Sequence, residues 1–425
     1  MQKIPFTESL KNSFAGPGPV TFALITLWAA LMFSKALTSI AVVAALLFWI
    51  LWRFRKHDWR LHLEPRVLGI LLSFMIWVCL SVFWSEARPQ SLKGLQKTGE
   101  YLLIFFLVSD VFQCSVALKK WEKSFLIIAL IVIADGWFQY KTGKDFIRRF
   151  AVEHSGSGVR LSACFNTYGL FACYLISTLP ILGGLALRFW REKNKIYTAL
   201  YAAAFFLSLP LLYWTRSRGA LLAAILGFLV FLIYRRYFVH FLAALVVVIS
   251  AVFLLPKNIV IHLDIDSKEQ SLVERLYLWD RAAHVIKARP WTGTGINTYA
   301  VAHQKYDKTQ NWRVKNYYAH NGYLQMAAEI GIPGLFLFLL FLFNFFKISL
   351  KKIKDWLRSS KPEQGFPLLG ICLGVLNFLI LTLVDTILHN PPSIKLFWYL
   401  SALAFVYAPA KLAKKQAKNK LEAAF

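Results

Sequence analysis

Acidic residues are scarce in this chain of 425 residues, with 22 Asp and Glu against 49 Lys and Arg and a formal net charge of +27. Cysteine is also rare: the five cysteines form no Cys-x-x-Cys pair, and most lie in apolar runs. This pattern argues against a disulfide framework or a thiolate metal site. No RNA- or DNA-binding pattern accompanies the positive charge. The charge therefore indicates anionic lipid, phosphate or diphosphate partners.

Apolar residues are abundant, at 57% of the chain, and the mean hydropathy is +0.51. Apolar runs of roughly 15 to 20 residues recur, as bilayer-spanning helices require. The N-terminus lacks a signal-peptide pattern, so we expect the first helix to be retained. The sequence predicts an all-α polytopic membrane protein with about 12 transmembrane helices. The predicted spans are 20–36, 38–54, 67–84, 99–113, 124–140, 170–189, 196–215, 219–237, 240–256, 332–350, 367–386 and 396–411.

Lys and Arg residues predict the orientation of these spans, because cytoplasmic loops carry the excess of both. Alternate loops and the C-terminal tail KLAKKQAKNK are rich in them, so we expect both termini to be cytoplasmic. We divide the chain into helices 1–9 (1–256), a large helical periplasmic loop (257–331), and helices 10–12 with the tail (332–425). The other loops expected outside are 85–98, 141–169, 216–218 and 387–395.

Basic residues also occupy the outer loops, against the usual bias. Arg216 and Arg218 lie at a helix start, Arg160 lies in a loop, and Arg275 lies on an amphipathic helix. Paired guanidinium groups bind diphosphate by charge-assisted, bidentate contacts. The plain alternatives are snorkelling for Arg216 and Arg218, and solvated charges for Arg160 and Arg275. Basic side chains kept on the outer face favour an anionic substrate there.

The segment RVKNYYAHNGYLQMAAEIGIPG, residues 313–334, ends the longest polar stretch and leads into an apolar helix. His320 and Asn321 immediately precede a helical pattern, with Tyr323 at its start. A helix N-terminus disfavours imidazolium, and a neutral imidazole accepts a proton near physiological pH. His320 is thus a candidate general base; the alternative is a residue that merely caps the helix.

Metal and nucleotide motifs are weak. Asp264-Ile265-Asp266 has the spacing by which many nucleotide-sugar transferases hold a metal, but such pairs are common by chance. The turn TGTGIN follows no strand and is too short for a phosphate-binding loop. Asp110 and Asp135 are expected near helix ends, whereas a proton-coupled transporter would more often place acids at the midplane. We therefore predict no metal and no cofactor. Asp385 and His389 lie near the outer end of a span, where a polar helix end is the plain explanation.

Taken together, TRSRGA at an outer helix start, RLYLW, PWTGTGIN and AHNGYLQMAAEIGIPG resemble the O-antigen ligase and O-antigen polymerase superfamily. The resemblance runs from about Arg160 to Gly334. It implies a GT-C-like fold and a catalytic role for the histidine at His320. The family's donor-binding arginines fall on Arg218, Arg275 and Arg160, although Ala163 and Tyr168 depart from the usual pattern near Arg160. An acidic family position corresponds to Asp385.

The resemblance further implies an undecaprenyl-diphosphate-linked glycan donor and a lipid A–core acceptor. The setting would be the periplasmic face of a Gram-negative inner membrane. We expect an O-antigen ligase-type glycosyltransferase that inverts the anomeric centre, with Arg216 joining the donor-binding arginines and with Asn321 and Tyr323 supporting His320. The absence of a long C-terminal periplasmic part disfavours a protein-glycosylating relative. Two alternatives remain: an O-antigen polymerase, which shares the motifs, and a lipid-linked glycan transporter, which would bind the glycan without reacting.

Overall fold

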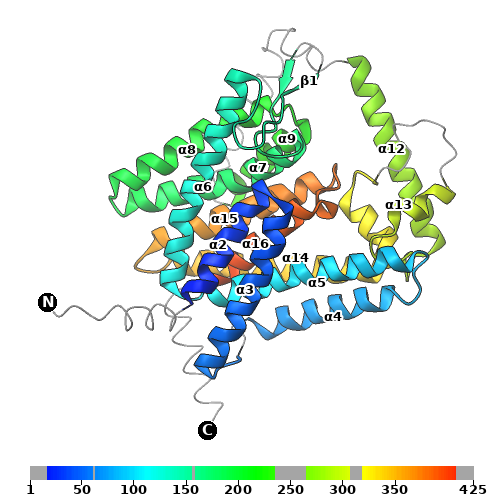
Figure 1. Ribbon diagram of the computed structural model, residues 1–425, viewed down its shortest axis with the longest axis horizontal. Coiled ribbons are helices and arrows are strands. Elements are labelled where there is room, and N and C mark those ends of the chain that lie inside the picture. Colours follow the sequence, from blue (N-terminus) through cyan, green and yellow to red (C-terminus); the bar gives the residue numbers. More distant parts are fainter. Residues whose placement is uncertain (1–16, 61–62, 156–157, 235–264, 307–317, 408–425) are drawn as a thin grey trace.

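The computed structural model describes residues 17–60, 63–155, 158–234, 265–306 and 318–407 (Figure 1). The first helices are α2 (Gly18–Phe33), α3 (Lys35–Lys56), α4 (Pro65–Ser81), α5 (Arg88–Val111) and α6 (Ser115–Thr142). A hairpin of β1 (Glu153–Ser155) and β2 (Gly158–Arg160) precedes α7 (Tyr168–Arg191), α8 (Lys195–Trp214) and α9 (Arg218–Tyr234). The remaining elements are α12 (Ile265–Ala288), α13 (Tyr299–Ala302), η1 (His303–Lys305), α14 (Gly322–Leu357), η2 (Pro362–Gln364), α15 (Gly365–Thr382), η3 (Ile387–His389) and α16 (Pro391–Val406).

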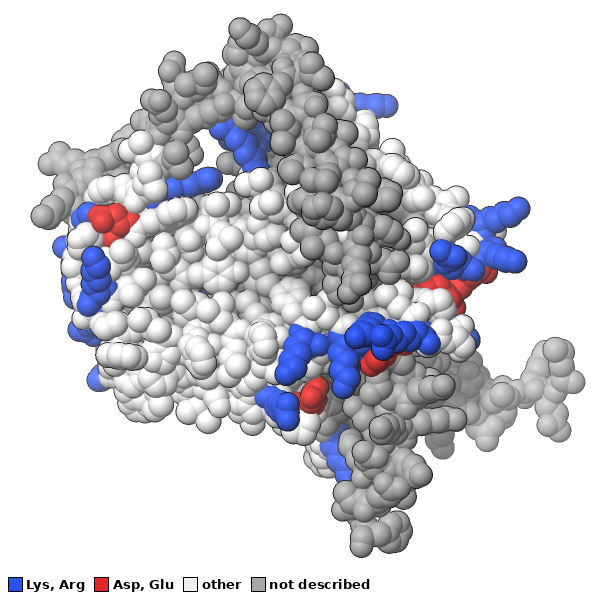
Figure 2. Space-filling model, turned by 180° about the vertical axis from the view of Figure 1, so that it is seen from behind, with Lys and Arg blue, Asp and Glu red and all other residues white. Residues whose placement is uncertain are grey.

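The molecule is a helical membrane protein. Within the described ranges, 5 helices are long and apolar enough to cross a membrane, or 6 if the bent pair α5 and α6 is one span. Three shorter apolar helices, α2, α4 and α9, accompany them. Figure 2 shows a broad uncharged face with Lys and Arg at its margins, as a surface in contact with lipid requires.

The predicted spans coincide with helices wherever the chain is described, and the predicted span 240–256 lies outside the described residues. The predicted count of about 12 transmembrane helices is thus supported only in part, because several helices are too short to cross alone. The predicted spans 99–113 and 124–140 fall in α5 and α6, which are longer than predicted. The two helices meet at an angle of 118°. Asp135 lies two turns before the C-terminal end of α6, and its Oδ1 accepts a hydrogen bond from the Phe146 backbone N–H at 2.8 Å.

Helices α7 and α15 form the closest pair in the core. A Cβ atom at Gly374 would lie 2.1 Å from the Ser177 carbonyl oxygen, and one at Gly370 would lie 2.4 Å from that of Pro180. Only glycine therefore permits this approach, and the spacing of four residues puts both glycines on one face of α15. The contact fixes α15, and with it the chain that follows Thr382, against the rest of the molecule.

Helix α14 is broken at Gly331, whose backbone has φ 71° and ψ 175°. Such a break leaves helix carbonyls without intrahelical partners. The loop after α12 supplies partners, because Thr294 N donates to Ala328 O at 3.0 Å and Gly295 N donates to Glu329 O at 2.8 Å. The Trp77 indole donates to Ile330 O at 2.7 Å. The TGTGIN turn thus caps the first part of α14.

Helices α12 and α13 stand together at one end of α4, α5 and α14 (Figure 1). Contacts between the loop after α12 and the turn between α4 and α5 fix them there. Trp84 Nε1 donates to Thr292 O at 2.8 Å, and Glu86 N donates to Thr294 O at 3.0 Å. The described part of the expected periplasmic loop therefore lies beside the start of the expected outer loop 85–98.

A buried polar cluster joins α6, α7, α8 and the end of α16. Glu122 Oε1 receives hydrogen bonds from Arg188 Nη1 at 2.6 Å and from the Tyr407 hydroxyl at 2.8 Å. The Tyr201 hydroxyl donates to the Glu122 carbonyl at 2.8 Å. All four side chains are buried. We call these residues the Glu122 cluster; every charge in it has a close partner, which is the arrangement that a buried ion pair requires.

Candidate active site

The candidate site begins at the first turn of α14. Asn321 is the N-cap residue: its Oδ1 accepts from Tyr323 N and from Leu324 N, both at 3.0 Å. His320 precedes the cap in a left-handed conformation, with φ 46°. The side chain that caps the helix is therefore that of Asn321. The alternative that His320 is merely a helix cap does not apply. The imidazole remains at the positive end of the helix.

Asp385 lies opposite His320. The distance from His320 Nδ1 to Asp385 Oδ1 is 3.7 Å, with 30% of the histidine side chain and 38% of the aspartate side chain exposed. This separation is longer than a direct hydrogen bond. An imidazole that turns Nδ1 toward a carboxylate points Nε2 away from it. The Nδ1 side of the His320 ring thus faces Asp385, and both side chains are partly exposed to solvent.

Two motifs that are far apart in the sequence meet beside this pair. A Cβ atom at Gly322 would lie 2.6 Å from Thr382 Cγ2, so the start of α14 packs directly on the end of α15. A Cβ atom at Gly219 would lie 3.0 Å from Val384 Cγ2. The SRG segment and the HNG segment therefore both contact residues 382–384, immediately before Asp385. The glycine of each motif permits that contact.

The predicted arginines approach this region to different degrees. Arg218 is the first residue of α9 and is exposed, next to the Gly219 contact. Arg216 has φ 52° and its guanidinium covers Gly158 of the hairpin, where a Cβ atom would lie 1.8 Å from Nη2. Arg160, in β2, lies over the Tyr168 ring at 4.7 Å. Arg160 and Arg216 thus gather at the hairpin.

Arg275 is on α12, one turn before Trp279. The Trp279 indole donates to the His320 carbonyl oxygen at 3.4 Å, which ties α12 to the residue that carries the candidate base. Residues four apart share a helix face, so Arg275 lies on the side of α12 that Trp279 uses. Tyr323, the other predicted supporting residue, donates its hydroxyl to Leu379 O at 3.0 Å. That bond joins α14 to α15.

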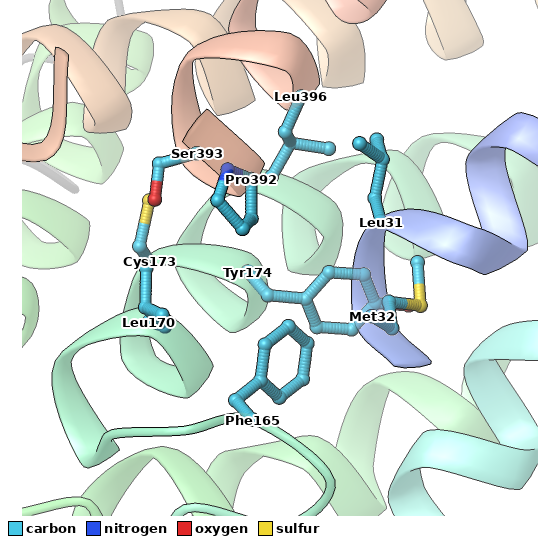
Figure 3. A pocket seen from close by; sticks show the side chains of 9 residues that line it. All are labelled: Leu31, Met32, Phe165, Leu170, Cys173, Tyr174, Pro392, Ser393 and Leu396. Carbon is cyan, nitrogen blue, oxygen red and sulfur yellow. The ribbon is translucent and has the colours of Figure 1, made fainter. Parts of the chain in front are cut away.

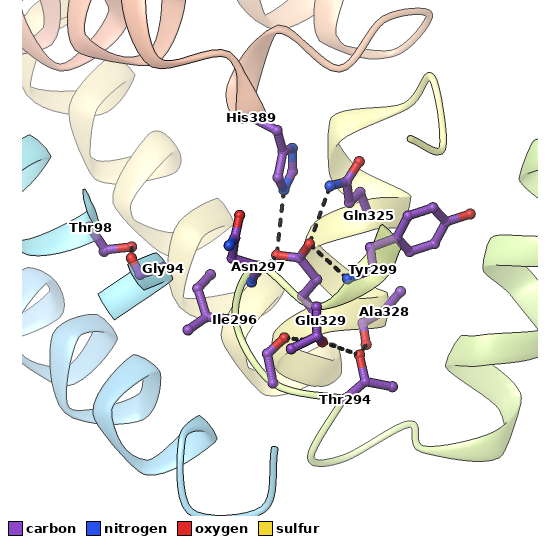
Figure 4. A network of polar contacts seen from close by, with 12 residues as sticks. Gly94, Thr98, Thr294, Ile296, Asn297, Tyr299, Gln325, Ala328, Glu329 and His389 are labelled. Carbon is purple, nitrogen blue, oxygen red and sulfur yellow. Dashed lines mark hydrogen bonds and ion pairs between the residues drawn. The ribbon is translucent and has the colours of Figure 1, made fainter. Parts of the chain in front are cut away.

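A second histidine–carboxylate pair lies nearby, and the sequence pattern did not identify it as a pair (Figure 4). Glu329 is 1% exposed and His389 Nε2 lies 3.7 Å from its Oε2. Glu329 also accepts from Asn297 N at 2.7 Å, Tyr299 N at 3.3 Å and Gln325 Nε2 at 3.2 Å. Burial, and then the charge of Glu329, raise the pKa of the Tyr299 phenol well above its ordinary value. We call His320, Asp385, Glu329 and His389 the His320 cluster.

The helices also enclose apolar hollows. One is lined by α2, α7, α16 and Phe165, with Cys173 and Ser393 next to each other at one side (Figure 3). A larger one, of about 800 Å³, lies between α7, α8, α9 and α15. Its α9 side begins at Ala224, below Arg218 on the same helix.

Metal ligands do not gather in the described ranges: no three His, Cys, Asp or Glu side chains there come together as a metal site requires. Asp264 lies outside the described residues, and Asp266 is in the first turn of α12.

Known proteins match the part of the chain that contains most of these candidate site residues. Residues 203–339 match the family model described as O-antigen ligase. A protein of Rickettsia conorii named "Putative polysaccharide ligase" is 25% identical over 302 residues, which cover 66% of this chain and 67% of the relative. A protein of Rickettsia felis with the same name is 26% identical over 219 residues, covering 47% of this chain and 51% of the relative. The matched family region contains Arg216, Arg218, Arg275 and His320.

Proposed function

Since this chain belongs to the O-antigen ligase superfamily, we propose that it is a membrane glycosyltransferase of the O-antigen ligase type. It would move a glycan from undecaprenyl diphosphate to lipid A–core at the periplasmic face of a Gram-negative inner membrane. Residues 1–256 and 332–425 would form the membrane part with both termini in the cytoplasm. Residues 257–331 would form the periplasmic part.

The observation that carries this proposal is the pairing of His320 with Asp385 beside the SRG segment. The two side chains are 3.7 Å apart and partly exposed. A general base needs a neutral lone pair, a partner that orients the ring, and access to the substrate. We assign the base to His320, before α14, and the orienting partner to Asp385, after α15, with the start of α9 beside them.

The proposed reaction is a single displacement. An acceptor sugar hydroxyl attacks the anomeric carbon of the donor, its proton passes to His320 Nε2, and the bond from the anomeric carbon to the diphosphate oxygen breaks. The attack comes from the face opposite the leaving group, so the configuration inverts. Asp385 holds the ring and stabilises the imidazolium that forms.

The departing diphosphate carries negative charge that must be stabilised. We assign this role to Arg218 and Arg275, with Arg216 and Arg160 at the hairpin. Guanidinium groups bind phosphate oxygens in a planar, bidentate geometry. Fixed positive charge aimed at a leaving group lowers the barrier without requiring a metal ion. The apolar hollow between α7, α8, α9 and α15 would hold the lipid part of the donor.

Deletion of the gene, followed by gel analysis of lipopolysaccharide, tests this function. The proposal predicts loss of all O-chain and accumulation of lipid-linked polymer, restored by the wild-type gene but not by His320→Ala. Lipopolysaccharide core bearing one repeat would instead identify a polymerase. Accumulation of donor on the cytoplasmic side only would identify a transporter.

A further inference from the structure

Two histidine–carboxylate pairs join the same two stretches of chain. The start of α14 supplies His320 and Glu329, and the turn 385–389 supplies Asp385 and His389. Each stretch therefore gives one histidine and one carboxylate, and the pairs cross between the stretches. The exposed pair is His320 with Asp385, and the more deeply buried pair is Glu329 with His389.

Glu329 is the fixed point of this arrangement. Its carboxylate accepts hydrogen bonds from two backbone N–H groups of the loop after α12 and from the Gln325 side chain (Figure 4). Its own backbone carbonyl receives the Gly295 N–H at the break in α14. A carboxylate held by three donors, with its backbone held as well, has one position in the structure.

His389 transmits that position to the turn. It is the last residue of η3, its Nε2 faces Glu329 at 3.7 Å, and its side chain is 15% exposed. The Tyr318 ring lies nearly parallel to it, with centroids 6.4 Å apart. The backbone N–H of His389 donates to Thr386 O at 2.9 Å, and the backbone N–H of Thr386 donates to Asp385 Oδ1 at 2.7 Å. A short chain of contacts thus connects Glu329 to the Asp385 carboxylate.

We propose that Glu329 and His389 are positioning residues that set Asp385 opposite His320. The inference rests on the proposed function, because it gives the Glu329–His389 pair a role in the reaction that we assign to His320 and Asp385. The separation between His320 and Asp385 exceeds a direct hydrogen bond, so their own attraction fixes their geometry only weakly. Small misplacements of a catalytic group lower reaction rates strongly. A rigid Glu329–His389 pair would prevent such misplacement of Asp385.

A double-mutant cycle tests this inference. His389→Ala is made in the wild-type protein and in Asp385→Asn, and transfer is measured with purified full-length protein in nanodiscs. In the wild-type background we expect kcat to fall about tenfold, with KM changed by less than about twofold, because binding groups are left in place. In the Asp385→Asn background the same substitution should change kcat by less than about twofold, since Asp385 no longer has a carboxylate to position.

Two further substitutions separate positioning from folding. His389→Gln keeps an N–H donor that reaches Glu329 and should restore most of kcat, whereas His389→Asn is too short to reach and should behave as His389→Ala. His284→Ala is the matched control: His284 faces Asp280 at 3.5 Å in an exposed pair on α12 and should leave transfer unchanged.

Equal losses of kcat in both backgrounds, or no loss in either, would overturn the inference. So would equal activities of the Gln and Asn variants. Should His389→Ala fail to fold, the Asn variant completes the cycle in its place. Full transfer by His320→Ala would instead overturn the proposed function. The two failures are distinguishable, because the inference is tested on the His389 variants and the function on the His320 variant.

Discussion

Two of the regions where charged side chains meet in the described part of the chain are built on opposite plans. In the Glu122 cluster the two charged groups, Glu122 and Arg188, are buried and lie 2.6 Å apart. In the His320 cluster the histidine–carboxylate separations are 3.7 Å, and His320 and Asp385 expose about a third of their side chains. The first cluster is buried among the helices, whereas the second is partly exposed at His320 and Asp385.

This difference separates stability from chemistry. A buried pair with complete hydrogen bonding joins helices and is costly to break. A loosely matched, partly exposed pair contributes little to stability, since exposed ion pairs are worth about 0 to 1 kcal/mol. Such a pair is compatible with the catalytic role that we propose for it. The comparison predicts that substitutions in the two clusters affect different measurements.

The largest effect is expected at His320. His320→Ala should lower transfer by about 10²- to 10⁴-fold, the usual loss when a general base is removed. Donor binding and thermal unfolding should remain near wild-type, because Asn321 still caps α14. Single-turnover transfer and donor affinity, measured on the same preparation, check this prediction. Near-normal turnover would show that His320 does no chemistry.

The next effect tests the other cluster. Arg188→Ala leaves the buried Glu122 charge without its main partner and should destabilise the protein by about 3 to 5 kcal/mol. Transfer per folded molecule should stay close to wild-type. Arg191→Ala, on an exposed position of the same helix, is the control and should leave the unfolding midpoint almost unchanged. If Arg188→Ala instead lowered transfer per folded molecule without changing stability, the proposed difference between the two clusters would be wrong.

A smaller effect is expected at the arginine that precedes the Gly219 contact. Arg218→Ala removes charge-assisted hydrogen bonds worth about 1.5 to 3 kcal/mol, so donor affinity should fall by roughly 10- to 150-fold. Arg218→Lys keeps the charge and loses the planar fork, and should recover only part of that loss. Arg358→Ala, at the far end of α14, is the control. Equal donor affinities for the Lys variant and the wild type would argue against bidentate binding.

The smallest effect is expected from removal of metal. Excess chelator should change transfer by less than about twofold, because arginines supply the positive charge in the proposed reaction. The double substitution of Asp264→Ala with Asp266→Ala should likewise remain active. Activity that disappears with chelator and returns with magnesium would overturn this prediction. The measurement needs only the purified protein and its two lipid substrates.

Sequence reasoning recovered the parts that local patterns determine. Apolar runs predicted the helices, and the polar residues before the apolar stretch predicted that α14 begins immediately after Asn321. The family motifs indicated His320 and Arg218. Their spatial meeting required the structure, because Gly219 and Gly322 approach residues 382–384 only after the helices have packed.

Other features depended on contacts that no local pattern carries. Glu329 reads in the sequence as one polar residue in an apolar stretch, and its pairing with His389 spans the whole of α15. The role of TGTGIN as a cap for α14 became apparent only with the break at Gly331. The hydrogen bond from the Phe146 N–H to Asp135 likewise depends on a loop that folds back onto α6.

The stereochemistry of the product tests the central claim most directly. Purified wild-type protein in nanodiscs is given a lipid-diphosphate-linked glycan of known anomeric configuration and the lipid acceptor, and the new linkage is assigned by NMR. Direct attack by an acceptor hydroxyl that His320 deprotonates predicts a product with inverted configuration and one released lipid diphosphate per linkage. A product with retained configuration would require a covalent intermediate and would contradict the account.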